Sequence, residues 1–220
     1  MIQFADIVKT WCARHGIVLA RYNSPERRER LQHFLRLRKD GRLWQNPADA
    51  CQLVCALQAT RGVAGEIAEV GTALGGSARL IAEYAGERQM LHVFDTFEGL
   101  PKPGEQDQQF SEGQYKTNFD KVKNYLSGLR VSFHKGIFPE SAETTKDARF
   151  SFVHLDVDLY KSTYEALDFF YPRMVIGGIL ISHDYVILPG VTQAFADFFK
   201  DKPETPIELI GYQAMFVKLQ

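Results

Sequence analysis

The chain has 220 residues, of which 45% are hydrophobic and 24% charged, and its formal net charge is −1. This length suits one α/β domain with a full hydrophobic core. The near-neutral charge gives no electrostatic reason to expect nucleic acid or an anionic membrane as a partner. The first residues lack the pattern of a secretory signal, and no apolar run approaches the roughly 20 residues of a membrane span. We therefore expect a cytoplasmic protein.

Three helices are predicted near the N-terminus. Apolar residues recur at helical spacing over residues 1–20. Ser24 and Pro25 are typical of a helix start, and an arginine-rich segment follows them. We expect that helix to be solvated on its charged face; the alternative is that it covers a site and meets an anionic group of a substrate. A third helix is predicted over residues 47–60.

These helices form a predicted extension or lid over residues 1–62. No Ser/Gly-rich linker separates it from residues 63–220, so we expect both parts to share one globule. All three cysteines, Cys12, Cys51 and Cys55, lie in the extension. An odd count without a second pair favours free thiols, buried or half-buried, in a reducing compartment over a zinc site.

From residue 65 onward, strand patterns alternate with helix patterns. Strands are predicted at 65–70, 90–94, 131–134, 150–155 and 179–182, and helices at 78–84, 118–127, 162–171 and 191–200. Residues 101–117 are polar and are predicted to form a long loop. Two short strands at 207–210 and 214–217 are predicted to form a hairpin. The alternation predicts an α/β fold with a mostly parallel, doubly wound sheet.

Two apolar strands stop abruptly at polar residues. The strand at 150–155 is followed by Asp156 and Asp158, and the strand at 179–182 is followed by His183 and Asp184. The carboxyl ends of parallel strands meet at one edge of the sheet, where ligands of such folds bind. We therefore expect these four side chains to share one site.

A glycine-rich turn joins the first strand to the next helix. It runs from Glu69 through Gly71 to Ser77, and its spacing is not that of the dinucleotide fingerprint. Backbone amides and a helix N-terminus gather at such a turn, and glycine lets a ligand approach the main chain. Glu69, two residues before the first glycine, suits a ligand with a positively charged amino-acid end and no pyrophosphate. The alternative is a turn that needs glycine only for packing.

Asp95 ends the second strand, about 20 residues after this turn, where an acid can accept hydrogen bonds from ribose hydroxyls. The alternative is a turn or capping acid. Thr96 and Phe97 follow it, and Phe97 is a candidate to pack on a nucleobase, although a phenylalanine beside a turn is more often part of the core.

Asp156, His183 and Asp184 offer oxygen and imidazole ligands for a divalent cation. A cation makes a bound hydroxyl more acidic, and a nearby carboxylate or histidine can take its proton. Asp158 and His183 are the candidate bases. The alternatives are a helix cap for Asp158 and a satisfied turn histidine for His183.

Together these motifs resemble the macrocin O-methyltransferase family of S-adenosylmethionine-dependent sugar O-methyltransferases. The resemblance rests on Glu69-x-Gly…Gly-x-Ser77, Phe94-Asp-x-Phe-Glu-Gly-Leu-Pro101, His154-Leu-Asp-x-Asp-Leu-Tyr-x-Ser-Thr163, Tyr171-Pro-Arg-x-x-x-Gly-Gly178 and Asp184-Tyr185. It covers roughly residues 65–200. It implies a class I, Rossmann-like methyltransferase fold with a seven-stranded sheet whose last two strands form an antiparallel hairpin.

The resemblance also implies roles for individual residues. Glu69, Gly71 and Ser77 would surround the methionine end of S-adenosylmethionine, and Asp95, with its neighbours Thr96 and Phe97, would hold the ribose side. The stretch Gly136, Ile137 and Phe138 would border the adenine. In the family, the position of Asp156 contributes to both the cofactor site and a magnesium site.

The chain departs from the family pattern at the metal site. By the resemblance, the ligands would be Asp156, His183 and Asp184, and His183 stands where the family usually has aspartate. A neutral imidazole lowers the negative charge of the site. It shifts the expected preference from Mg2+ toward Mn2+, iron or zinc, or leaves the site empty.

Three functions follow as hypotheses. The first is an O-methyltransferase acting on a hydroxyl of a sugar-like small molecule, with Asp158 or His183 as base. The second is a glycosyltransferase that uses Asp156 and Asp158 to hold manganese and a nucleotide sugar; the glycine turn and Asp95 argue against it. The third is a non-catalytic or diverged protein of the same fold. We also expect a homodimer through the N-terminal helices.

Overall fold

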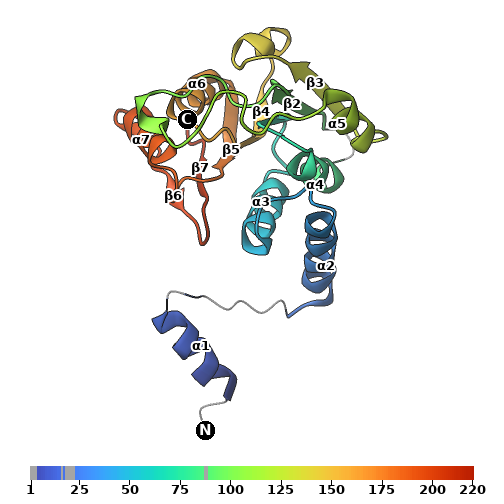
Figure 1. Cartoon of the computed structure of the whole chain (residues 1–220), viewed down its shortest axis with the longest axis vertical. Helices are drawn as coiled ribbons and strands as arrows, with labels where there is room; N and C mark the ends of the chain where they lie inside the picture. The colour runs from blue at the N-terminus through green and yellow to red at the C-terminus, as the bar shows by residue number, and fades with distance from the viewer. Residues whose placement is uncertain (1–3, 16, 18–22, 87–88) are drawn as a thin grey trace.

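A computed structural model describes residues 4–15, 17, 23–86 and 89–220 of the chain. Its centre is a seven-stranded sheet with the strand order β3-β2-β1-β4-β5-β7-β6 (Figure 1). The first five strands in sequence pair in parallel, whereas β7 runs antiparallel to β5 and β6 antiparallel to β7. The predicted mostly parallel sheet with a C-terminal antiparallel pair is confirmed.

The strands and helices alternate as predicted. The strands are β1 Glu66–Val70, β2 Leu91–Asp95, β3 Val131–Lys135, β4 Phe150–Leu155, β5 Met174–Ser182, β6 Ile207–Glu208 and β7 Ala214–Val217. The helices are α1 Phe4–Arg14, α2 Pro25–Lys39, α3 Pro47–Ala59, α4 Gly76–Tyr84, α5 Phe119–Tyr125, α6 Tyr160–Phe170 and α7 Pro189–Phe199. Short 3-10 turns cover Glu105–Asp107, Glu140–Thr145 and Tyr171–Arg173.

Helices cover both faces of the sheet because its strands are apolar on both sides. Successive strand residues face opposite layers. Ile67 and Phe152 pack toward α2, α3, α4 and α5, whereas Ala68 and Val153 pack toward α6 and α7. All four side chains are fully buried. Figure 1 shows α6 and α7 together on one side and α2, α3 and α4 on the other.

The N-terminal segment contributes to the core from α2 onward. Ser24 caps α2 through its side chain, as predicted, and Asn46 caps α3 by accepting from the amides of Ala48 and Asp49. The buried cluster on this face joins α2 and α3 to β1, β2 and α4. The division at residue 62 stays a prediction.

Helix α1 spans fewer residues than the predicted 1–20 and lies apart from the sheet in Figure 1. Residues 1–3, 16 and 18–22 lie outside the described part of the chain. Within the described part, no helix is both long and apolar enough to cross a bilayer.

No disulfide joins the cysteines. Cys12 is buried and Cys51 half-buried as predicted, but Cys55 is exposed, so the prediction of a buried or half-buried thiol was wrong for Cys55.

Two boundaries near the site differ from the prediction. Helix α6 begins at Tyr160 and its capping position is Leu159, without a side-chain cap, so Asp158 is not the cap. Strand β5 begins at Met174 and includes Gly177 and Gly178 rather than starting after them. The reason is an irregularity in the pairing of β4 with β5, which the left-handed φ of +81° at Gly177 accommodates.

Candidate active site

One cavity opens at the carboxyl ends of β1, β2, β4 and β5. Its walls come from the turns after these strands, from the connection between α2 and α3, and from the loop that follows β2. The residues around it include Arg42, Leu43, Trp44, Gln45, Gly71, Thr72, Ala73, Ser77, Asp95, Thr96, Leu100, Tyr115, Gly136, Ile137, Phe138, Asp156, Asp158, Ser162, His183 and Asp184. The four acid-cluster residues predicted at the strand ends all line it.

The glycine turn after β1 requires glycine at its first position. Gly71 has a φ of +81°, and a Cβ there would lie 2.0 Å from the carbonyl oxygen of Asp156. A side chain would therefore push apart the ends of β1 and β4. The turn leads into α4, and Ser77 in the first turn of α4 lines the cavity. Gly71 also lines the cavity, so the backbone of this turn can come close to a ligand.

Asp95 holds the same turn from the end of β2. Its Oδ2 accepts from the amides of Thr72 and Ala73 at 2.8 and 3.0 Å, and its Oδ1 accepts from the amide of Phe97 at 2.7 Å. A carboxylate has about four lone-pair positions. Asp95 therefore retains capacity for one further donor from the cavity, which Asp95 and Thr96 both line.

Phe97 does not line the cavity. Its side chain is 1% exposed and packs against Phe119 at a ring distance of 4.9 Å. The expectation that Phe97 packs on a nucleobase was wrong; its ring belongs to the core, and only its amide serves the site. The Gly136, Ile137 and Phe138 stretch does border the cavity.

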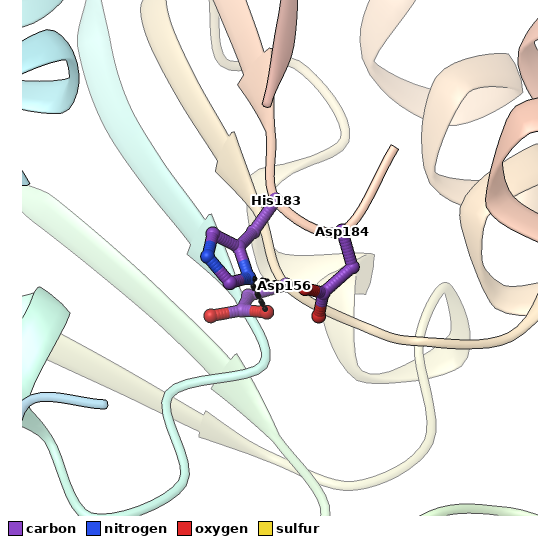
Figure 2. A group of neighbouring side chains, drawn as sticks. All are labelled: Asp156, His183 and Asp184. Atoms are coloured by element: carbon purple, nitrogen blue, oxygen red, sulfur yellow. Dashed lines mark ion pairs between the residues drawn. The ribbon is translucent and has the colours of Figure 1, made fainter. Parts of the chain in front are cut away.

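Asp156, His183 and Asp184 converge at the ends of β4 and β5, as Figure 2 shows. Nδ1 of His183 lies 3.4 Å from Oδ1 of Asp156 and 2.9 Å from Oδ1 of Asp184. One ligand atom from each residue lies within 4.8 Å of the others. Neither ring nitrogen of His183 makes a well-formed hydrogen bond to any described residue. Two carboxylates and an unsatisfied imidazole are a donor set that fits a divalent cation.

Burial and mutual charge shift the pKa values of this cluster. Burial opposes protonation of His183, but the negative charges of Asp156 and its neighbours outweigh it and raise the pKa of His183. Burial likewise opposes ionisation of Asp156, and the charge of His183 outweighs it and lowers the pKa of Asp156. The two groups favour each other's charged forms.

Asp158 has the opposite shift. Burial, followed by the charges of Asp156 and Asp184, raises its pKa well above the usual range. Its φ is +61°, and that of Asp184 is +59°, so both acids adopt the left-handed conformation where the chain leaves the strand. A carboxylate with a raised pKa is a stronger base than an exposed one.

Glu69 lies behind the cavity rather than on its wall. The side chain is fully buried, and its Oε1 lies 2.9 Å from Nδ1 of His154. Nε2 of His154 in turn lies 3.2 Å from Nε2 of Gln45, which lines the cavity. The direct contact of Glu69 with a ligand stays a prediction; in this structure the side chain of Glu69 is turned toward His154. His154 is fully buried and packed inside the sheet.

Several cavity residues were missed from the sequence. Trp44 and Gln45 come from the short connection between α2 and α3, which has no periodic pattern that would mark it. Arg42 lies in the same connection, at the end of the arginine-rich segment for which covering a site was the alternative. Arg42 donates to the carbonyl of Leu74 in the glycine turn at 3.2 Å. Tyr115, from the long loop, packs against Trp44 at a ring distance of 5.6 Å.

A model of the family described as Macrocin-O-methyltransferase (TylF) matches residues 42–218. The chain is 27% identical to demethyldecarbamoylnovobiocin O-methyltransferase of Streptomyces niveus over 223 residues, which covers 86% of this chain and 84% of that protein. It is 29% identical to 8-demethyl-8-(2,3-dimethoxy-alpha-L-rhamnosyl)-tetracenomycin-C 4'-O-methyltransferase of Streptomyces olivaceus over 145 residues, 57% of this chain and 55% of that protein.

Solved methyltransferases share the fold. The O-methyltransferase NovP has a TM-score of 0.70 and 22% identity, with coverage of 81% of this chain and 83% of that one. The O-methyltransferase of Bacillus cereus in complex with SAH has a TM-score of 0.60 and 15% identity, with coverage of 99% and 100%. At these identities the likeness shows the fold alone.

Proposed function

Because the chain belongs to the macrocin O-methyltransferase family, we propose that it transfers the methyl group of S-adenosylmethionine to a hydroxyl of a sugar-bearing small molecule. The observation that carries the proposal is the composition of the cavity. The glycine turn and Asp95 lie on one side of it, and Asp156, Asp158 and Asp184 lie at the adjoining strand ends. A methyl donor and an acceptor hydroxyl need these two surfaces next to each other.

The cofactor would lie across the edge of the sheet. Gly71 and Ser77 would face its methionine end, Asp95 and Thr96 its ribose, and Gly136, Ile137 and Phe138 its adenine. The solved Bacillus cereus structure of this fold holds SAH, which supports this choice of ligand.

The acceptor is proposed to be a sugar. The name of the Streptomyces olivaceus relative specifies a rhamnosyl compound as its substrate. Trp44 and Tyr115 border the cavity and remain 54% and 43% exposed. Their free faces can pack on the apolar face of a sugar ring or on an aglycone.

Asp158 is the proposed base. The acceptor oxygen attacks the methyl carbon in line, the bond from sulfur to that carbon breaks, and the hydroxyl proton passes to Asp158. The raised pKa of Asp158 makes it a better proton acceptor than an exposed carboxylate. His183 is a poorer candidate, because the surrounding carboxylates raise its pKa and favour its protonated form, which accepts no proton.

Asp156, His183 and Asp184 would hold a divalent cation, with Mn2+ favoured over Mg2+ by the imidazole. A bound cation would make the acceptor hydroxyl more acidic. The residues of the chain would then orient that hydroxyl toward the methyl group and toward Asp158. The homodimer and the cytoplasmic location stay predictions.

Binding and turnover measurements test the proposal. Calorimetric titration with S-adenosylmethionine and with its demethylated product should give saturable binding at one site per chain. Methyl transfer should follow when nucleotide-linked and aglycone-linked deoxysugars are supplied with Mn2+ or Mg2+. Absence of cofactor binding in the folded protein would overturn the proposal. Binding without transfer to any acceptor in a broad panel, with Asp158→Asn indistinguishable from wild type, would favour the non-catalytic alternative.

A further inference from the structure

A buried carboxylate lies behind the metal-type cluster and has no part in the proposed reaction. Asp49, near the start of α3, is fully buried and does not line the cavity. Its Oδ2 lies 3.5 Å from Nε2 of His183, on the opposite side of the ring from the nitrogen that faces Asp156 and Asp184. The ring of His183 therefore lies between Asp49, on the side away from the cavity, and the pair Asp156 and Asp184, which line the cavity.

Two separate parts of the chain hold Asp49 in this place. The amide nitrogen of Asn46 donates to its Oδ2, and this orientation of Asn46 is fixed because its oxygen caps α3. The backbone amide of Tyr212, in the β6–β7 hairpin, lies 3.4 Å from its Oδ1. At Gly211, where φ is +108°, a Cβ would lie 2.1 Å from the same oxygen. The hairpin thus comes so close to Asp49 that only glycine fits.

The carboxylate restricts how His183 can present its ring. A neutral imidazole carries its proton on one nitrogen and a lone pair on the other, and a carboxylate can only accept. Asp156 and Asp184 lie nearer to Nδ1 and attract a proton there when no cation is bound. With a cation between those two acids, Asp49 would retain the remaining proton on Nε2 and leave the lone pair of Nδ1 for the cation. Metal-ligating histidines commonly have such a carboxylate partner behind them.

Charge balance supports the same arrangement. The carboxylates of Asp49, Asp156, Asp158 and Asp184 lie around a single imidazole. A protonated His183 supplies a single positive charge to several buried acids, and a divalent cation that displaces the proton from Nδ1 would balance them better. Among the described residues around this cluster, no lysine or arginine forms an ion pair with these acids.

From this geometry we infer that Asp49 is the positioning residue of a carboxylate–histidine pair that presents Nδ1 of His183 to a divalent cation shared with Asp156 and Asp184. This inference rests on the metal site of the proposed function. It assigns to the N-terminal segment, which packs against the sheet through α3, a role in setting the affinity of the site for a cation.

A double-mutant cycle on metal affinity tests it. Asp49→Asn keeps the shape of the side chain but removes its negative charge, so position 49 holds the proton on Nε2 less strongly and presents Nδ1 to a cation less well. Binding of Mn2+, measured by titration without substrate, should weaken about 10- to 100-fold. In the His183→Asp background, Asp49→Asn should change the affinity less than about twofold, since no ring remains to be positioned.

The cycle separates positioning from capping. Asp49 also occupies the first turn of α3, where an acid stabilises a helix in any background. Equal weakening of Mn2+ binding in both backgrounds would therefore overturn the inference. Glu204→Gln is the matched control, because Glu204 is a 3% exposed carboxylate bonded to Tyr171 and Lys218; it should leave Mn2+ affinity unchanged.

A second measurement uses the unmodified chain. In protein with 15N-labelled histidine, addition of Zn2+ should shift the Nδ1 resonance of His183 to a metal-bound value while Nε2 stays protonated. Ligation through Nε2 would overturn the inference. So would a complete lack of Mn2+ and Zn2+ binding in protein that still binds S-adenosylmethionine and transfers methyl groups, an outcome that leaves the proposed function intact.

Discussion

Replacing Gly71 with alanine should destabilise the protein far more than a glycine change elsewhere with the same backbone conformation. The φ of +81° at Gly71 is one that an L-residue reaches at a cost of about 1–2 kcal/mol. The new Cβ would also lie 2.0 Å from the carbonyl oxygen of Asp156, whereas ordinary contacts begin near 3.4 Å. Forcing an atom into such a packed place adds about 1–3 kcal/mol.

Gly128 isolates the first of these two costs. Its φ is +84°, and a Cβ there would meet nothing within 4 Å. Gly128→Ala should therefore lower the free energy of unfolding by about 1–2 kcal/mol, and Gly71→Ala by about 2–5 kcal/mol. Urea unfolding followed by circular dichroism measures both, and a cofactor titration should show weaker binding only for Gly71→Ala. Equal destabilisation by the two variants would refute the close contact between β1 and β4.

Three other predictions follow from the site and its surroundings. Asp158→Asn should lower kcat by about 10²- to 10⁴-fold while the Kd for S-adenosylmethionine stays within about twofold; a large change in that Kd would instead place Asp158 in the cofactor site. Trp44→Ala should raise KM for the acceptor by roughly 3- to 10-fold, and an unchanged KM would remove Trp44 from the acceptor surface. Burial lowers the pKa of both His92 and His134, and Nδ1 of His92 lies 2.9 Å from Nε2 of His134. The unfolded chain therefore binds protons before the folded chain does as pH falls through 6.5, and stability should decrease below that pH. Urea midpoints between pH 8 and pH 5 measure this loss, and His134→Phe should reduce it; an equal loss in that variant would contradict the assignment.

Local sequence patterns were sufficient to predict the site residues that lie at the ends of strands. Asp95, Asp156 and Asp184 follow apolar strands, and parallel strands share a carboxyl edge, so these acids were expected in one place before any coordinates. Gly71 was equally visible, because a glycine between a strand and a helix points to a tight turn. The sheet and its C-terminal hairpin followed from the alternation of strand and helix patterns together with the family resemblance.

The sequence did not predict which way the side chains near these positions point. Phe97 stands two residues after Asp95, and a phenylalanine there can face the ligand or the core; the packing of α5 decides for the core. Glu69 lies on the face of β1 that is covered by the N-terminal helices, so its neighbour is His154 and not the cavity.

The sequence by itself determined the fold class and the acids at the strand ends, because both depend on periodicity within single elements. Only the tertiary structure decided which distant residues complete the site. Trp44 and Gln45 lie in a connection without periodicity, and Asp49 contacts His183, which lies 134 residues later in the sequence. Such contacts arise from the packing of α3 against the sheet. The local sequence around each of these residues does not predict which distant residue it will contact.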